Sequence, residues 1–255
     1  MKLTYMASVA TFASLAGART FTVKNNCAFT VWPAIFTDLN VGSAVPSHAT
    51  GWEAPPHTSV SFFVPDKWQA GRIWGRRECD FSNPDPAKQC VTGGCSGGLI
   101  CDPHIGIGAT PATVAEFTLR AGDKVDYYDV SLVDGYNLPV QIDNDKGCHV
   151  ASCPVDLAAS CPEPLRGPLD SRGLNLGCKS ACAANVDGHP TDSGNCCSGS
   201  HSTPDKCPPS GVAYYSYFKG HCPNAYAYAY DESSGTALFT CDSDLGANYK
   251  ITFCP

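Results

Sequence analysis

The chain has 255 residues, of which 43% are hydrophobic and 16% charged, with a formal net charge of −7. So large an apolar fraction can bury a core, which excludes intrinsic disorder, and the negative balance without a basic run excludes a typical nucleic-acid binder. The 24 glycines, 20 prolines and 16 cysteines favour short strands and cross-linked loops over a helix bundle.

Residues 1–18 are predicted to be a secretory signal peptide. Lys2 precedes an apolar run over residues 3–15, and Ala16-Gly17-Ala18 supplies the small residues of a cleavage site. A first buried strand or helix is the alternative. The run is shorter than the ~20 apolar residues that span a membrane, and no later stretch approaches that length. We therefore expect a protein secreted to the extracellular space or cell wall, without stable membrane insertion.

An even number of cysteines in an exported chain predicts eight structural disulfides. The alternative is zinc, with Cys178 and Cys182, or Cys90, Cys95 and Cys101, as the ligands. It is disfavoured because no second pair follows at zinc-ribbon spacing and the histidines are scattered. We expect no metal and no other cofactor. The count leaves the pairing open, and proximity alone favours only the short loops Cys79–Cys90 and Cys95–Cys101.

In chain order, the apolar pattern alternates between strands and cysteine-rich loops. Strands are predicted within residues 19–76, 111–143 and 223–255, the last beginning with the alternating stripe Tyr226, Tyr228 and Tyr230. Between them, loops rich in Cys, Gly and Pro permit only short helices, at 156–160, 179–184 and 213–219. The pattern predicts an all-β core of two antiparallel sheets packed face to face, with two disulfide-rich insertions.

Carboxylates in the second group of strands are the best candidates for chemistry. If Ala121-Gly122 forms a two-residue turn, Glu116 faces Tyr127, and Asp129 lies diagonal to Glu116 on the same face. Diagonal neighbours have Cβ atoms about 7–8 Å apart, so two carboxyl groups can flank a sugar linkage. A turn one residue longer would move Asp129 to the opposite face, and a solvated polar sheet face is the alternative interpretation.

Several short motifs resemble those of the thaumatin-like proteins, also called the PR-5 family. None is specific alone, but together with 16 cysteines in order they cover the whole predicted mature chain. The motifs are Phe21–Trp32, Gly71–Arg76, Thr92–Leu99, Ala115–Phe117, Asp129–Pro139, Cys196-Cys197, His221–Pro223 and Asn248–Pro255.

The resemblance implies a mainly β architecture in three parts. It places an antiparallel β-sandwich in residues 19–76, 117–154 and 223–255, a small disulfide-looped domain in 77–116, and a disulfide-rich, partly helical domain in 155–222. It also implies the disulfide pairs Cys27–Cys254, Cys79–Cys90, Cys95–Cys101, Cys148–Cys241, Cys153–Cys222, Cys161–Cys178, Cys182–Cys196 and Cys197–Cys207.

The family has an acidic cleft between the sandwich and the disulfide-rich domain, built from one Arg, one Glu and three Asp. The matching catalytic positions are Glu116, Asp129 and Asp134. The expected substrate-binding positions are Arg72, Asn224, which stands where the family has its fifth acidic residue, and Tyr136, which could stack on a sugar ring.

Members of the family bind β-1,3-glucans, and some hydrolyse them weakly. We therefore expect a monomer that binds β-1,3-glucan or another wall polysaccharide, with weak endo-β-1,3-glucanase activity as the enzymatic form of this hypothesis. In that form Glu116 is the general acid, while Asp129 or Asp134 activates water or stabilises the oxocarbenium-like charge. The alternatives are a non-enzymatic antifungal or defence protein, a protein inhibitor, and a wall-associated protein without catalysis, which the Asn224 substitution favours.

Overall fold

The computed structural model describes residues 17–105, 108–120 and 122–255. The predicted signal peptide lies almost entirely outside this range. Within the described residues, no helix has the length and hydrophobicity needed to cross a membrane.

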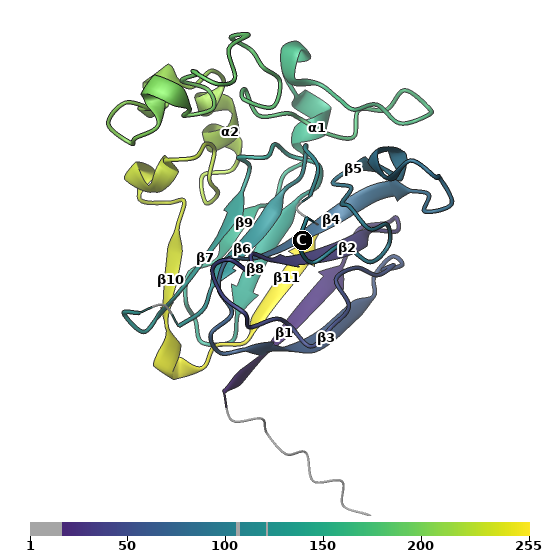
Figure 1. Ribbon diagram of the computed structural model, residues 1–255, viewed down its shortest axis with the longest axis vertical. Helices are drawn as coiled ribbons and strands as arrows, with labels where there is room; N and C mark the ends of the chain where they lie inside the picture. The colour runs from purple at the N-terminus through teal and green to yellow at the C-terminus, as the bar shows by residue number, and fades with distance from the viewer. Residues whose placement is uncertain (1–16, 106–107, 121) are drawn as a thin grey trace, which may run out of the picture.

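Two β-sheets form the body of the molecule (Figure 1). The first sheet has five strands in the order β3-β1-β11-β8-β9, and all its neighbours are antiparallel except β1 and β11. Its strands are β1 (Ala18–Asn25), β3 (Ser59–Pro65), β8 (Val140–Asn144), β9 (Ala151–Cys153) and β11 (Tyr249–Phe253).

The second sheet has six strands and carries the cleft described below. Its order is β10-β7-β6-β4-β2, with β5 paired to the far end of β4. Its strands are β2 (Trp32–Thr37), β4 (Gly71–Cys79), β5 (Cys90–Thr92), β6 (Val114–Thr118), β7 (Val125–Ser131) and β10 (Phe239–Asp242).

The core lies between the two sheets and is built from aromatic rings. Phe21 of β1 packs against Phe117 of β6 with ring centroids 4.9 Å apart, and Tyr249 of β11 packs against Phe117 at 5.5 Å. Strict alternation of half-buried and buried residues along β1 places every second side chain in this core. The predicted mainly β sandwich is therefore confirmed.

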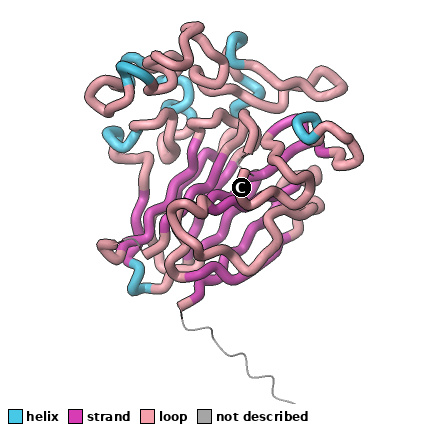
Figure 2. Tube along the Cα trace, viewed as in Figure 1, coloured by secondary structure: helices cyan, strands magenta, loops and turns pink. Residues whose placement is uncertain are grey.

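Most of the loops and short helices gather at one end of the strands (Figure 2). The α-helices of the described residues are α1 (Leu157–Ser160) and α2 (Tyr215–His221). Short 3₁₀ turns lie at 86–88, 163–165, 199–201, 209–211, 231–234 and 243–245. Eight disulfides join the same pairs that the family resemblance implies. So many bridges suit an oxidising, extracellular compartment.

Local predictions were wrong at two places. The stretch 179–184 forms turns instead of a helix, and the tyrosine stripe 226–230 is not a strand. A disulfide joins Cys182 to Cys196 in the first stretch, and the Tyr226 backbone pairs with Ser131 in the second. Strand β6 runs through residues 116 and 117, and the division into three domains stays a prediction.

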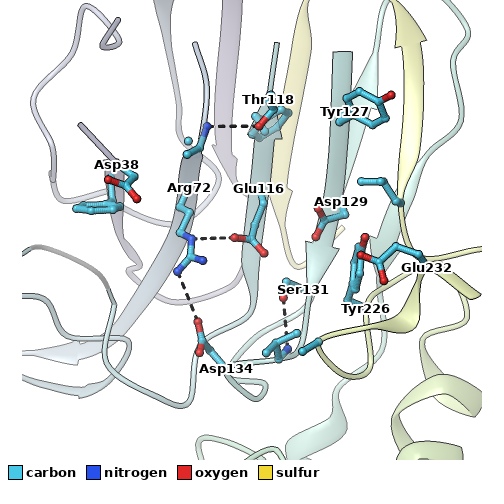
Figure 3. A pocket seen from close by; sticks show the side chains of 17 residues that line it. Asp38, Arg72, Glu116, Thr118, Tyr127, Asp129, Ser131, Asp134, Tyr226 and Glu232 are labelled. Atoms are coloured by element: carbon cyan, nitrogen blue, oxygen red, sulfur yellow. Dashed lines mark hydrogen bonds and ion pairs between the residues drawn. The ribbon is translucent and has the colours of Figure 1, made fainter. Parts of the chain in front are cut away.

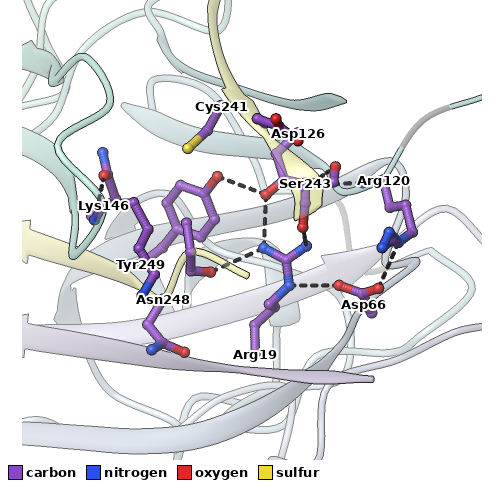
Figure 4. A network of polar contacts seen from close by, with 12 residues as sticks. Arg19, Asp66, Arg120, Asp126, Lys146, Cys241, Ser243, Asn248 and Tyr249 are labelled. Atoms are coloured by element: carbon purple, nitrogen blue, oxygen red, sulfur yellow. Dashed lines mark hydrogen bonds and ion pairs between the residues drawn. The ribbon is translucent and has the colours of Figure 1, made fainter. Parts of the chain in front are cut away.

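A buried polar network ties the lower ends of both sheets together (Figure 4). Arg19 of β1 is 3% exposed, and its guanidinium donates to Asp126 of β7 at 2.8 Å and to Asp66 at 2.5 Å. The fully buried Asp126 also accepts from the hydroxyls of Ser243 and Tyr249. Every oxygen of Asp126 thus has donors, as a buried charge requires.

Replacing Arg19 by Met should destabilise the fold strongly. Asp126 would keep its neutral donors but lose its counter-charge, and removing one partner of a buried ion pair costs about 3–5 kcal/mol. Chemical denaturation with the disulfides intact measures this loss. The matched control is Lys88→Met, because Lys88 forms an exposed ion pair with Asp85 and should matter little. Equal losses in both variants would contradict the stabilising role of the network.

Candidate functional site

A row of side chains crosses the outer face of the second sheet. Arg72 of β4 lies directly opposite Glu116 of β6, and Glu116 lies directly opposite Asp129 of β7. Phe36 of β2 continues the row beyond Arg72. Directly opposed residues have Cβ atoms about 4.5–5.5 Å apart, so the sheet itself holds one guanidinium and two carboxyl groups side by side.

This row forms the floor of a cleft of about 510 Å³. The cleft is lined by Phe36, Asp38, Ala70, Gly71, Arg72, Glu116, Phe117, Thr118, Tyr127, Asp129, Ser131, Val133, Asp134, Tyr226, Ala229, Glu232 and Leu238. Figure 3 shows the carboxyl groups of the floor, the Asp134 turn and the 226–238 segment converging on one space.

The wall of the cleft is the segment that follows α2. Tyr226 pairs with Ser131 of β7 in parallel, through its amide to the Val130 carbonyl and its carbonyl to the Leu132 amide, both at 2.9 Å. This pairing places the start of the 226–238 segment alongside β7, next to the cleft. As a consequence, Asp129 is only 8% exposed although it points away from the core of the sandwich.

Arg72 supplies the positive charge in the floor. Its Nε lies 2.8 Å from a Glu116 oxygen, and its Nη1 lies 4.0 Å from Asp134. All three side chains are about one-third exposed, so the ion pairs are open to the solvent that fills the cleft. Arg72 therefore fixes Glu116 in place and favours its ionised form.

The three carboxyl groups titrate above their ordinary range. Burial raises the pKa of Glu116, and the Arg72 charge partly opposes this rise. Burial and the neighbouring Glu116 raise the pKa of Asp129 well above its usual value. Burial also raises the pKa of Asp134. Arg72 pairs with Glu116, while the buried Oδ2 of Asp129 has no donor within the part of the chain that the structure describes. The geometry therefore favours charge on Glu116 and the proton on Asp129.

Asp134 enters the cleft from a tight turn. The Gly135 amide donates to the Leu132 carbonyl, and Gly135 has a φ of 86°. A Cβ at this position would lie 2.9 Å from the Cys178 carbonyl oxygen. The turn therefore requires glycine, which both adopts the left-handed backbone and lets the 178–180 segment approach.

Glu232 is a cleft residue that the sequence reasoning missed. It follows Asp231, a buried carboxylate that accepts from the Lys219 ammonium, the Tyr215 hydroxyl and the Ala227 amide, all at 2.9 Å. Those contacts anchor the turn, so Glu232 faces Asp129 and Tyr226 (Figure 3). The alternating tyrosines 226–230 predicted a strand, and an extended segment would have placed residue 232 beyond the cleft. Glu232 was therefore not expected to line it.

Two of the expected substrate-binding residues do not reach the cleft. Tyr136 is fully buried, and its hydroxyl donates to Asp156 at 3.3 Å. Asn224 is exposed, but it pairs through its backbone with Ser152 and does not line the cleft. The acidic side chain on this wall is Glu232, so the substitution at Asn224 does not remove a charge from the site.

The register of the β6–β7 hairpin differs by two residues from the expected one. Thr118, not Glu116, faces Tyr127, because the β6–β7 ladder ends at the pair Thr118–Tyr127, and Val125 at the start of β7 pairs with β10 instead. The Asp126 side chain accepts from the Arg120 amide and holds this longer loop. An even shift preserves the face, so Glu116 and Asp129 lie together as predicted, but opposite instead of diagonal.

Replacing Asp129 by Asn should stabilise the protein at neutral pH. A carboxyl whose pKa is raised on folding lowers stability as the pH rises above its unfolded value of about 3.9. The amide has no charge to desolvate, so we expect thermal unfolding about 2–4 °C higher at pH 7, the shift that about 1 kcal/mol gives in a chain of this size. Below about pH 4 the two proteins should unfold at the same temperature.

The control is Glu53→Gln, which removes an exposed carboxylate and should leave the unfolding temperature unchanged. A difference in unfolding temperature between wild type and Asp129→Asn that stays constant from about pH 4 to pH 7 would contradict the burial penalty at Asp129.

Known proteins with similar sequences cover nearly the whole chain. "Pathogenesis-related thaumatin-like protein 3.5" of Cryptomeria japonica is 42% identical over 259 residues, covering 100% of this chain and 98% of its own. A Prunus avium protein named "Glucan endo-1,3-beta-glucosidase" is 40% identical over 251 residues, covering 96% and 95%.

Among solved structures, a family 64 laminaripentaose-producing β-1,3-glucanase from Paenibacillus barengoltzii, complexed with laminarihexaose, superposes with a TM-score of 0.55. It is 13% identical, and the match covers 98% of this chain and 80% of the glucanase, so it shows a shared fold alone. The family model "Thaumatin family" matches residues 25–255, and with the relatives above this match shows that the chain belongs to the thaumatin family.

Proposed function

We propose that this protein binds β-1,3-glucan in the cleft on the outer face of the second sheet. The observation that carries the proposal is the row Arg72–Glu116–Asp129, which three neighbouring strands hold in an open cleft. Carboxylates and a guanidinium together can accept from and donate to sugar hydroxyls. The name of the Prunus avium relative supports the same polymer.

The floor also carries two directly opposed carboxyl groups, and glycoside hydrolysis needs one protonated and one ionised carboxyl. The general acid expected from the sequence is Glu116. The contacts favour the reverse, because Arg72 pairs with Glu116 at 2.8 Å and no donor among the described residues contacts the buried oxygen of Asp129. We assign Asp129 as proton donor to the glycosidic oxygen and Glu116 as the ionised partner that activates water or stabilises the developing positive charge.

Sugar release from laminarin tests this assignment. Both Asp129→Asn and Glu116→Gln should lower the rate by about 10²–10⁴-fold, the usual contribution of a positioned acid or base. Laminarin binding should persist in both variants, since each amide can still form hydrogen bonds. Equal release by wild type and both variants would refute the catalytic pair, and absence of both binding and release in the wild type would refute the function.

The pH dependence separates the two roles. If Asp129 is the acid, the alkaline limb of the activity profile should follow the raised pKa of Asp129 and should be absent from residual Asp129→Asn activity. Glu116→Gln should retain that limb. The opposite pattern would restore Glu116 as the acid.

Tyr127 should form one end of the sugar-binding surface. It lines the cleft, is half-buried, and its hydroxyl donates to Asp123 at 2.5 Å, which holds the ring in place. Stacking on an aromatic ring contributes about 1 kcal/mol, so Tyr127→Ala should weaken laminarihexaose binding about fivefold, while Tyr127→Phe keeps the ring and most of the affinity. Calorimetric titration measures both. Equal weakening in the two variants would point to the hydroxyl and contradict stacking.

A further inference from the structure

The cleft contains more negative charge than a neutral sugar needs. Its lining has five carboxyl groups and a single guanidinium, a formal charge of −4 when all are ionised. Arg72 is committed to Glu116 at 2.8 Å and to Asp134 at 4.0 Å. On the opposite side, no Lys, Arg or His among the described lining residues accompanies Asp129 and Glu232.

Asp129 provides independent evidence that the Asp129–Glu232 side of the cleft binds a group from a ligand. Asp129 is 8% exposed on the cleft side of β7, and its Oδ2 has no hydrogen-bond partner among residues 17–105, 108–120 and 122–255. Buried polar atoms in native proteins nearly always have a partner, so this oxygen indicates a partner that arrives with a ligand, and a cationic donor would displace the proton that Asp129 otherwise holds. A cationic donor would also offset the repulsion that Glu116 and Glu232 exert on Asp129.

The two walls define where such a donor would lie. Glu116 and Asp129 face outward from the sheet, while Glu232 and Tyr226 face them from the covering segment (Figure 3). Phe36 and Leu238 line the same cleft and give it apolar surface for the flat face of a sugar ring. Acidic groups around a ring-sized, partly apolar space match an amine carried on a sugar.

On the basis of the proposed glucan-binding function, we propose that the cleft prefers amino sugars. The ligand class is a β-linked polymer with 2-amino-2-deoxyglucose units, one of whose ammonium groups lies among Glu116, Asp129 and Glu232. This ligand differs from a neutral glucan of the same linkage only in the charged group at C2. The sugar backbone then determines where the ligand lies in the cleft. The ammonium group determines the preference for an amino sugar over a neutral sugar.

The test compares two hexamers of the same linkage. A fully deacetylated β-1,4-glucosamine hexamer carries the amine, and cellohexaose carries a hydroxyl in its place. Calorimetric titration at low ionic strength should show that the glucosamine hexamer binds at least about tenfold more tightly than cellohexaose. Added salt should reduce this ratio of affinities. Equal affinities would overturn the proposal.

Matched variants separate the site from the net charge of the protein. Glu232→Gln should reduce the preference by about three- to tenfold, while Glu53→Gln, which removes the same charge from an exposed position outside the cleft, should leave it unchanged. Equal effects in the two variants would overturn the site. A lysine hexapeptide that binds as tightly as the glucosamine hexamer would overturn the sugar specificity.

Laminarihexaose, titrated in the same series, tests the underlying glucan function separately. If the protein binds laminarihexaose but does not distinguish the two β-1,4 hexamers, the proposed function stands and the preference for amino sugars is refuted. If the protein does not bind laminarihexaose, the proposed function is refuted, whatever the affinity for the glucosamine hexamer.

Discussion

The backbone pairing of Tyr226 with β7 is the contact on which the site depends. Without it, Glu116 and Asp129 would be solvated groups on the outer face of a sheet, as most such residues are. With it, the 226–238 segment covers Asp129 and restricts water around its carboxyl group. The same pairing brings Glu232 to the cleft. The two backbone hydrogen bonds of Tyr226 therefore support both the burial of Asp129 and the additional negative charge of Glu232.

Rigidity on both sides makes this arrangement possible. Behind the floor, the Arg19–Asp126 pair fixes the β6–β7 hairpin to the first sheet, and Asp126 lies three residues from Asp129 on the same strand. Behind the wall, Asp231 receives three donors and precedes Glu232 directly. Asp129 and Glu232 thus each lie within three residues of a buried carboxylate that accepts several hydrogen bonds. Carboxyl groups that repel one another need such support, because the fold must hold them at a distance they would otherwise increase.

Sequence reasoning could predict the sandwich and the grouping of Glu116 with Asp129, because a period of two determines the face of every strand residue. It could not predict the register, since that depended on how the Asp126 side chain holds the hairpin loop. It also could not place residues 224–232. Their alternating tyrosines are typical of a strand, but anchoring of Asp231 by Lys219 turns the segment into the wall. Tertiary contacts of polar side chains determine both the β6–β7 register and the path of residues 224–232. A local sequence pattern carries no information about such contacts.

The electrostatics of the cleft connect stability with recognition. A carboxyl group that is buried beside another costs folding free energy in its ionised form, and it retains a proton to limit that cost. In the proposed hydrolysis this proton passes to the departing sugar oxygen and leaves Asp129 ionised beside Glu116. In the proposed binding of an amino sugar, the arriving cation displaces the proton and offsets the repulsion between the two carboxylates. A neutral glucan allows only the first event, whereas an amino sugar allows both. The same unfavourable arrangement of carboxyl groups therefore underlies both proposals, hydrolysis of a neutral glucan and tighter binding of an amino sugar.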